Sequence, residues 1–428
     1  MISSEHPNSL NLNVRGLSPS ATLAINEKSN ELIAQGKKVY KMGLGQSPFP
    51  VPESVVAKLR EFAHEKDYLP VKGLYPLRQT LARFNQQEYG IECRAEDIMI
   101  GPGSKELIFI LQLVYYGDLI IPAPGWVSYS PQARIVGRNV HILPTEAANR
   151  WQMTAEQLDY LCRTDPSRPR VVILNYPANP TGCTYSPKSL EEIAEVARKY
   201  KVILISDEIY GRLHFEGLHR SIAEFYPEGT IISSGLSKWC GAGGWRLGTF
   251  SFPANLHWLL DAMAIVASET YTSTSAPIQY AAIRAFEGGA DIDHYLHLSR
   301  QILKRIATHL VHRLTQLNIQ VMEPDGAFYL FIDFEHYRDA LQKKNIFTSV
   351  ELCKQLLKDT GIAFLPGHDF GRSPEELTSR LAFVNFEGKH ALNHHQIYQN
   401  MPLVEYIHKI APEVKSAMDQ LEAWLIAL

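Results

Sequence analysis

The chain has 428 residues, of which 45% are hydrophobic and 20% are charged, and its 42 basic and 45 acidic side chains leave a net charge of −3. These values are typical of a globular protein that is too long for one ordinary core, which favours two domains. Because the chain has no basic excess and no apolar run near the ~20 residues that span a bilayer, we expect neither nucleic acid nor a membrane as a partner.

The cysteines are odd in number, and no two have CxxC spacing: Cys93, Cys162, Cys183, Cys240 and Cys353. This pattern argues against a disulfide framework or a zinc ribbon. The first 20 residues are polar and lack the apolar segment of a signal peptide, so we expect a cytoplasmic protein with free thiols. Two histidine pairs, His294/His297 and His394/His395, have no third ligand in view, and we expect no metal site.

The N-terminal region begins with an arm rich in Ser, Asn and Pro over residues 1–20. A polar helix is predicted over Ala21–Gln35, followed by a Gly- and Pro-containing loop over Met42–Pro50 and by a second helix from Pro52.

The middle of the chain repeats one pattern, in which a short apolar run leads into turn residues and then into a helical stretch. Five such runs lie at residues 98–100, 119–121, 171–174, 202–205 and 231–232. Unbroken apolar strands indicate a sheet that is buried on both faces, and their alternation with helices predicts an α/β domain with a largely parallel sheet. Ligands of such sheets bind beyond the carboxyl ends of the strands, where Gly, Asn, Asp and Ser gather in this sequence.

After about residue 290, helical stretches dominate, and strands are predicted at Ala327–Ile332 and Ser379–Phe386. The tail from residue 395 is predicted as one or two amphipathic helices. We therefore expect three parts: residues 1–50 as an N-terminal arm and part of a small domain, residues 51–299 as a large domain that binds the ligand, and residues 300–428 as a small C-terminal α+β domain.

The segment Gly101-Pro102-Gly103-Ser104-Lys105 joins a predicted strand to a predicted helix. Backbone N–H groups at the start of a helix can bind an anion, with the Ser104 hydroxyl as a further donor. The alternative is a tight turn in which Ser104 only caps the helix. No third glycine completes a dinucleotide fingerprint, which argues against a nicotinamide-dependent dehydrogenase.

A lysine in unusual surroundings, Lys238, follows a buried strand within a loop of small residues. A lysine beside apolar or cationic groups can act as a nucleophilic amine, and Arg246, eight residues later, suits a phosphate. The alternative is a solvent-exposed lysine in a flexible loop.

Three polar residues follow two other predicted strands. Asp207 could cap a helix or pair with a cofactor cation, and Tyr210 can reach the same place. Asn179 offers an amide donor or is simply a turn residue. A carbonyl cofactor with a phosphate group needs an amine, an anion site, an acid for its pyridine nitrogen and donors for its phenolate oxygen. Pyridoxal 5′-phosphate (PLP) is such a cofactor.

Four motifs then give a specific resemblance. They are Asn-Pro-Thr-Gly at 179–182, Ser-Asp-Glu-Ile-Tyr at 206–210, Ser-Lys at 237–238 with Gly-Trp-Arg-Leu-Gly at 244–248, and Arg-Leu-Ala-Phe at 380–383. In this order and spacing the chain resembles the fold-type I, class I PLP-dependent aminotransferases, the aspartate and aromatic aminotransferase group. The resemblance implies a three-layer α/β large domain with a mostly parallel sheet, the PLP-dependent transferase fold, beside a smaller α+β domain, and it makes residues 51–299 the PLP-binding domain.

The resemblance also implies roles for individual residues. Lys238 would form the Schiff base with PLP and move the substrate proton, Asp207 would pair with the pyridinium nitrogen, and Asn179 and Tyr210 would donate to the 3′ oxygen. The phosphate would be bound by the hydroxyls of Ser104 and Ser237, by the guanidinium of Arg246 and by the backbone at Gly103 to Lys105. Trp126 would stack on the ring, although a core tryptophan is the alternative.

On the substrate side, the resemblance implies that Arg380 grips the α-carboxylate, that Gly45 lies in the loop over the substrate and that Asn179 also contacts the substrate. Tyr68 would reach the phosphate in a neighbouring subunit, which implies a homodimer with shared active sites. A dicarboxylic substrate would need a second arginine, for which Arg15 and Arg284 are candidates by elimination. The chain departs from many relatives at Gly235, where they have a serine.

These observations predict a PLP-dependent aminotransferase that moves an amino group from an amino acid to a 2-oxo acid by a ping-pong mechanism. A PLP-dependent lyase or decarboxylase on the same scaffold is the alternative within enzymes. A non-catalytic PLP-binding sensor fused to a DNA-binding domain is a third possibility, but the chain shows neither an N-terminal helix-turn-helix segment nor a basic excess.

Overall fold

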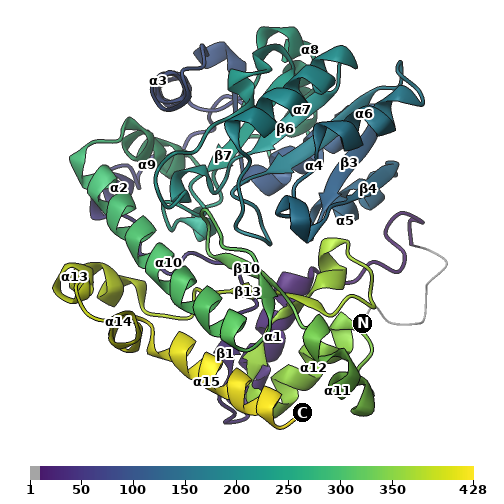
Figure 1. The fold of residues 1–428 in the computed structure, drawn as a ribbon. Helices are drawn as coiled ribbons and strands as arrows, with labels where there is room; N and C mark the ends of the chain where they lie inside the picture. The colour runs from purple at the N-terminus through teal and green to yellow at the C-terminus, as the bar shows by residue number, and fades with distance from the viewer. Residues whose placement is uncertain (1–9) are drawn as a thin grey trace.

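The computed structural model describes residues 10–428, so residues 1–9 of the predicted N-terminal arm lie outside the described residues. A seven-stranded sheet forms the centre of the larger part of the molecule (Figure 1). Its strands, in spatial order, are β2 (Ile98–Gly101), β8 (Gly248–Ser251), β7 (Thr230–Gly235), β6 (Ile203–Asp207), β5 (Arg170–Asn175), β3 (Asp118–Ala123) and β4 (Val140–Pro144).

β8 runs antiparallel to both of its neighbours, β2 and β7, and all the other strand pairs in this sheet are parallel. Helices cover both faces: α4 (Ser104–Val114), α5 (Tyr129–Ile135) and α8 (His257–Ser268) contribute to one apolar cluster, and α6 (Ala155–Arg163) and α7 (Pro187–Lys199) contribute to another. The strands supply both clusters, because successive side chains point to opposite faces. Ile173 packs with the α4 side, and Val172 and Leu174 pack with the α7 side.

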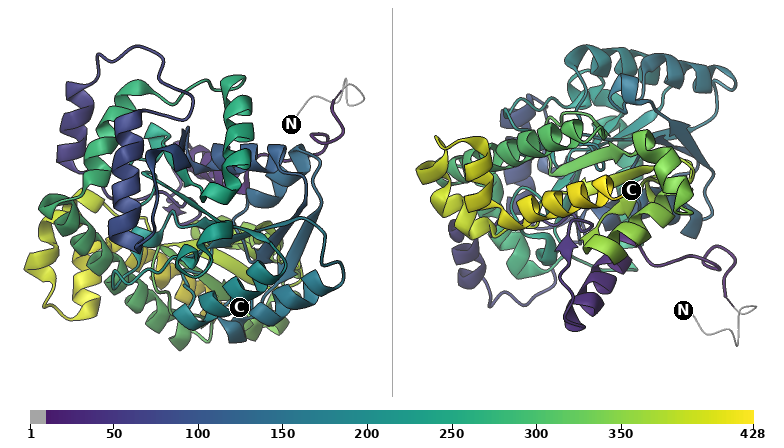
Figure 2. Two further views of the ribbon diagram at one scale, coloured as in Figure 1. Left: turned by 90° about the horizontal axis from the view of Figure 1, so that it is seen from above. Right: turned by 60° about the horizontal axis from the view of Figure 1, so that its bottom comes forward.

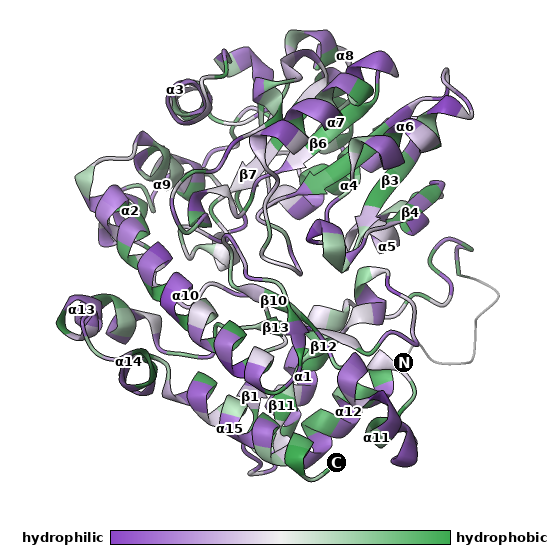
Figure 3. Cartoon of the chain, in the orientation of Figure 1, coloured by the Kyte–Doolittle hydropathy of each residue, from purple (hydrophilic) through white to green (hydrophobic). Residues whose placement is uncertain are grey.

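In Figure 3 the central strands β3 and β6 are coloured as hydrophobic, whereas much of the surrounding helices, such as α7 and α8, is coloured as hydrophilic. The three-layer α/β architecture with a mostly parallel sheet is therefore confirmed. The two strands β4 and β8 were not predicted from the sequence.

A smaller part of the molecule contains a four-stranded antiparallel sheet and a two-stranded parallel pair. The four strands, in spatial order, are β12 (Leu365–Pro366), β13 (Thr378–Ala382), β10 (Tyr329–Asp333) and β9 (Gln320–Val321). The pair joins β1 (Tyr40–Lys41), near the start of the chain, to β11 (Ile362–Ala363). The N-terminal segment thus pairs with the C-terminal third of the chain.

Helices connect and surround the two parts. They are α1 (Ala21–Ala34), α2 (Glu53–Glu61), α3 (Tyr75–Tyr89), α9 (Ala276–Glu287), α10 (Ala290–Gln316), α11 (Arg338–Lys343), α12 (Ser349–Thr360), α13 (Gly388–Tyr398), α14 (Leu403–Ile410) and α15 (Pro412–Ile426). The 27-residue helix α10 runs along the side of the molecule from one part to the other (Figures 1 and 2). The predicted division between residues 299 and 300 falls inside this helix.

Three predicted segments differ from the structure in their ends. The tail forms three helices rather than one or two, because Pro402 caps α14 and Pro412 begins α15, and proline cannot continue a preceding helix. The strand predicted from Ala327 begins at Tyr329, since Ala327 has a φ of 59°. The strand predicted to reach Phe386 ends at Ala382, where its pairing with β10 also ends. Within residues 10–428, no helix combines the length and apolar character needed to cross a membrane.

Candidate active site

A cavity of about 580 Å³ lies at the carboxyl ends of β5, β6 and β7, and both parts of the molecule contribute to its walls. Most of the residues predicted for the site line it: Gly45, Ser104, Lys105, Trp126, Asn179, Asp207, Tyr210, Ser237, Lys238, Arg246 and Arg380. Gly103 directly precedes the lining residue Ser104. Tyr68 does not line the cavity, and its side chain is 89% exposed.

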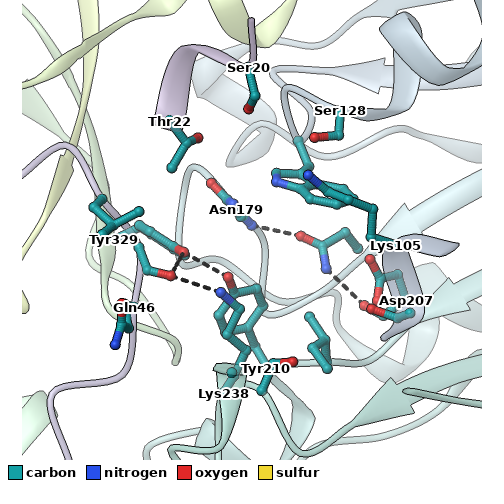
Figure 4. A pocket seen from close by; sticks show the side chains of 18 of the residues that line it. Ser20, Thr22, Gln46, Lys105, Ser128, Asn179, Asp207, Tyr210, Lys238 and Tyr329 are labelled. Carbon is teal, nitrogen blue, oxygen red and sulfur yellow. Dashed lines mark hydrogen bonds between the residues drawn. The ribbon is translucent and has the colours of Figure 1, made fainter. Parts of the chain in front are cut away.

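Lys238 follows β7 and points toward the loop that contains Gly45 (Figure 4). Its Nζ donates a hydrogen bond of 2.8 Å to the carbonyl of Gly45. Burial, together with the nearby charges of Arg380 and Arg246, lowers the pKa of Lys238 to about 8. About a tenth of this amine is therefore unprotonated, and nucleophilic, at pH 7, far more than for a lysine with the ordinary pKa.

Asp207 ends β6 and is the only carboxylate among the described residues that line the cavity. Burial raises the pKa of Asp207 to about 6, while hydrogen bonds from Tyr129 at 2.5 Å and Ser233 at 3.3 Å oppose that rise. Asn175 donates to the backbone carbonyl of Asp207 at 2.8 Å and accepts from the backbone of Asn179 at 2.7 Å. These contacts fix the carboxylate at the wall of the cavity, where a cationic partner would keep it ionised.

The start of α4 faces the cavity and is shaped by close backbone packing. Gly103 has a φ of 95°, and a Cβ there would lie 2.2 Å from Nη2 of Arg246. A Cβ at Gly248 would lie 2.1 Å from the backbone nitrogen of Ser104, so β8 passes directly behind this turn. Among residues 10–428, Arg246 donates only to the carbonyls of Gly243 at 3.0 Å and Pro102 at 3.3 Å, which holds its guanidinium against the turn.

The glycine at position 235 is explained by this same packing. Gly235 pairs with Gly248 in the sheet, and a Cβ at Gly235 would lie 2.6 Å from the carbonyl oxygen of Leu247. A serine would displace the neighbouring strand.

Arg380 lies on β13 with only 1% of its surface exposed. It donates to Oδ1 of Asn179 at 3.0 Å and to the carbonyl of Gly43, and its guanidinium lies 4.7 Å from the ring centre of Tyr329. Its Nε has no hydrogen-bond partner within the described part of the chain. The guanidinium is thus held from several sides with donor capacity left for an anion.

The charges of the cavity are strongly unbalanced. Lys105, Lys238, Arg246 and Arg380 line it against the single carboxylate of Asp207, and none of the four forms an ion pair with another residue in 10–428. Such a lining suits anionic groups, and a phosphate together with a carboxylate would supply them. The donors at the start of α4, the buried carboxylate and the amine with a lowered pKa thus fit PLP.

Several lining residues were not predicted. Tyr329 lies on β10, Tyr129 lies on α5, and Asn175 ends β5; of these, only Asn175 had a signal, as a polar residue directly after an apolar run. Ser20 and Thr22, at the start of α1, also line the cavity (Figure 4).

The two arginines considered for a second substrate carboxylate do not line the cavity. Arg284 donates to the carbonyl of Gly288 and pairs with Asp291 instead, and the guanidinium of Arg15 lies elsewhere. All five cysteines are free. In the part of the chain that the structure describes, no three His, Cys, Asp or Glu side chains are placed to hold a metal ion.

Comparison with known proteins extends these observations. Residues 37–383 match the family model of aminotransferases of class I and II. An aspartate aminotransferase of Bacillus sp. (strain YM-2) is 32% identical over 84% of this chain and 91% of its own length. An asparagine–oxo-acid transaminase of Streptococcus mutans is 30% identical over 91% of this chain and 98% of its own length. The structure of the Thermus thermophilus aspartate aminotransferase with maleate superposes with a TM-score of 0.82, at 27% identity, over 97% of this chain and 99% of that one.

The chain therefore belongs to the class I and II aminotransferase family. It is a PLP-dependent aminotransferase, which moves an amino group from an amino acid to a 2-oxo acid by a ping-pong mechanism. The predicted fold, cofactor and type of reaction are confirmed, and the lyase and sensor alternatives are not favoured.

Proposed function

We propose that this aminotransferase acts on an acidic amino acid, with aspartate as the first candidate. The observation that carries this proposal is the position of the Lys105 ammonium group in the wall of the cavity. Lys105 lines the cavity, its Nζ lies 5.1 Å from the ring centre of Trp126, and it forms no ion pair within residues 10–428. With Arg380 assigned to the α-carboxylate and Arg246 to the cofactor phosphate, Lys105 is the cation left for a second carboxylate.

The electrostatics of the site support this assignment. Burial lowers the pKa of Lys105, and the adjacent charge of Arg246 lowers it further, so a negative partner would be favourable beside this ammonium group. The hydroxyls of Ser20 and Thr22 add neutral donors to the lining. Relatives named as aspartate aminotransferases from several bacteria point to the same substrate class.

The roles of the chain's own residues follow from their positions. PLP, when bound, supplies an electron sink for the carbanion at the substrate Cα. Lys238 would hold PLP covalently through Nζ and, once displaced, would carry the proton to and from the substrate Cα. Asp207 would keep the pyridine nitrogen protonated, and Asn179 and Tyr210 would donate to the 3′ oxygen.

The remaining assignments concern the phosphate and the substrate. The start of α4 with Ser104, together with Ser237 and Arg246, would bind the phosphate, and Trp126 would stack on the ring. Arg380 would orient the α-carboxylate, so that the Cα–H bond faces Lys238.

The enzyme is further proposed to be a cytoplasmic homodimer in which Tyr68 of each chain completes the site of the other. The high exposure of Tyr68 supports its contact with a second chain. The five free cysteines support a cytoplasmic location. The division into a large domain at 51–299 and a small domain at 300–428 likewise remains a proposal.

The test of the substrate class is the Lys105→Met variant, which keeps the length of the side chain and removes its charge. We expect kcat/KM for aspartate to fall about 10- to 100-fold, the effect of one charge-assisted contact, whereas kcat/KM for alanine changes less than about threefold. Asparagine serves as the discriminating substrate, because its neutral amide depends less on a cation. Equal losses for aspartate and alanine would contradict a role of Lys105 in substrate choice.

A further inference from the structure

Two buried phenols, those of Tyr210 and Tyr329, contact each other beside Lys238. Tyr210 follows β6 in the large part, whereas Tyr329 is the first residue of β10 in the small part, and their side chains are 2% and 1% exposed. Their oxygens lie 2.7 Å apart, and their rings are nearly perpendicular at 81°. In Figure 4 the ends of Tyr210, Tyr329 and Lys238 meet on one side of the cavity.

The loop at Gly45 leaves space for this contact. A Cβ at Gly45 would lie 1.9 Å from the oxygen of Tyr329, so any other residue there would displace the phenol. The carbonyl of Gly45 lies 3.5 Å from the Tyr329 oxygen and 2.8 Å from Nζ of Lys238. The contact between Tyr329 and this carbonyl is long at 3.5 Å, whereas its contact with Tyr210 is short at 2.7 Å, so the distances favour Tyr210 as the partner of the Tyr329 hydroxyl.

The hydrogen bond between the two phenols can run in either direction. Each phenol has one proton to donate and can also accept a hydrogen bond, so the direction decides which proton remains available. If Tyr329 donates to the carbonyl of Gly45, Tyr210 must donate to Tyr329 and has no proton left for the cavity. If Tyr329 donates to Tyr210 instead, the proton of Tyr210 is free to reach a third oxygen. Only the second arrangement allows Tyr210 to donate to a cofactor oxygen.

We propose that Tyr329 is a positioning residue, which donates its proton to Tyr210 and thereby strengthens Tyr210 as a donor to the 3′ oxygen of PLP. The inference rests on the role given to Tyr210 in the proposed function. A phenol that accepts one hydrogen bond becomes a better donor in the next, since consecutive hydrogen bonds polarise one another.

The charged groups that face this pair remain in place when only the hydroxyl of Tyr329 is removed. They are Lys238, Arg380 and Asp207, with Lys105 and Arg246 acting on Lys238. A Tyr329→Phe variant also keeps the ring that lies under the guanidinium of Arg380. The variant therefore isolates the proton that Tyr329 gives to Tyr210.

The experiment follows the visible absorption of the holoenzyme against pH. A weaker donor stabilises less negative charge on the 3′ oxygen, so the nitrogen that links Lys238 to the cofactor loses its proton at a higher pH. For Tyr329→Phe we expect the midpoint of the absorption change to rise by about 0.5 to 1 pH unit, the effect of one hydrogen bond. An unchanged midpoint would overturn the proposal.

Two further variants distinguish this role from a structural one. In a Tyr210→Phe background, the Tyr329→Phe change should cause no additional shift, and a full shift there would show that Tyr329 acts independently of Tyr210. Tyr185→Phe is the matched control, because Tyr185 is a buried phenol that accepts a hydrogen bond from Met153 and does not line the main cavity. Its midpoint should equal that of the wild type.

Maleate provides a second measurement. Its affinity for Tyr329→Phe should stay within about twofold of the wild type, because the ring under Arg380 is retained. A larger loss would show that the hydroxyl acts on the carboxylate site, which would overturn the proposal. If the wild-type protein itself shows no visible band with PLP, the proposed function fails instead, so the two failures are distinguishable.

Discussion

Lys238 shows how position rather than residue type creates reactivity. Burial and two arginines lower the pKa of its amine from 10.5 to about 8, because each disfavours the charged form. Its carbonyl partner, Gly45, is 193 residues away in sequence. The loop motif identified the lysine, but the lowered pKa depends on neighbours that only the fold brings together.

We predict that the cofactor-free protein combines with PLP at a rate that rises with pH, with a midpoint of about 8. The sign follows from the lowered pKa, since the amine is mostly protonated and unreactive below it and mostly free above it. Stopped-flow absorbance over a pH series measures this rate. A lysine in solution has a pKa of about 10.4 and serves as the comparison, and Lys238→Ala should form no visible band. A midpoint near that of the free lysine would contradict the assignment.

Two of the residues that the sequence did not reveal, Tyr329 and Tyr129, share one property. Tyr329 contacts Tyr210 across 119 positions of sequence, and Tyr129 contacts Asp207 across 78 positions. Both are aromatic residues that periodicity places in a core. The proton that each offers to a functional group depends on tertiary packing, which a local pattern does not encode.

At the scale of elements, the junction of β2 and α4 forms the proposed anion site. The glycine turn ends with Gly103 at a φ of 95°, α4 begins at Ser104, and Arg246 from the loop before β8 lies against the turn. The local pattern of strand, glycine turn and helix predicted this junction. It did not show that Gly248 must lack a side chain because β8 passes directly behind Ser104.

We predict that Arg246→Met lowers the affinity of the cofactor-free protein for PLP about 10- to 100-fold, because one or two charge-assisted hydrogen bonds to the phosphate are lost. The affinity for pyridoxal, which has no phosphate, should change less than about twofold. Fluorescence titration with both compounds measures the difference. Arg60→Met is the control, since Arg60 is an exposed residue that pairs with Glu53. Similar losses for PLP and pyridoxal would argue against a phosphate contact.

At the scale of the whole molecule, the cavity exists because distant parts of the chain meet. Its walls come from the first turn of α1, from the strand ends of the large sheet, and from β10 and β13 of the small sheet. The pairing of β1 with β11 ties the N-terminal segment to the C-terminal third. Movement of one part relative to the other would change the distance between Arg380 and Lys238.

We predict a dimer in which each active site uses Lys238 from one chain and Tyr68 from the other. Neither Lys238→Ala nor Tyr68→Ala alone should support full activity. Mixing the two variants under exchange conditions should restore about a quarter of wild-type activity, because half of the dimers are hybrids with one intact site. Light scattering gives the mass, and activity after mixing gives the complementation. A dimer without complementation would place Tyr68 outside the partner's site.

The sequence by itself determined the class of fold, the cofactor and eleven of the 23 residues that line the cavity. Unbroken apolar strands require a sheet covered on both faces, and the spaced motifs place polar residues at the strand ends, as the structure shows for Asp207. Only the tertiary structure decided which cations lack partners, which glycines leave room for a neighbour and which phenols touch. These properties depend on distances between segments far apart in sequence, and packing of the complete chain sets those distances.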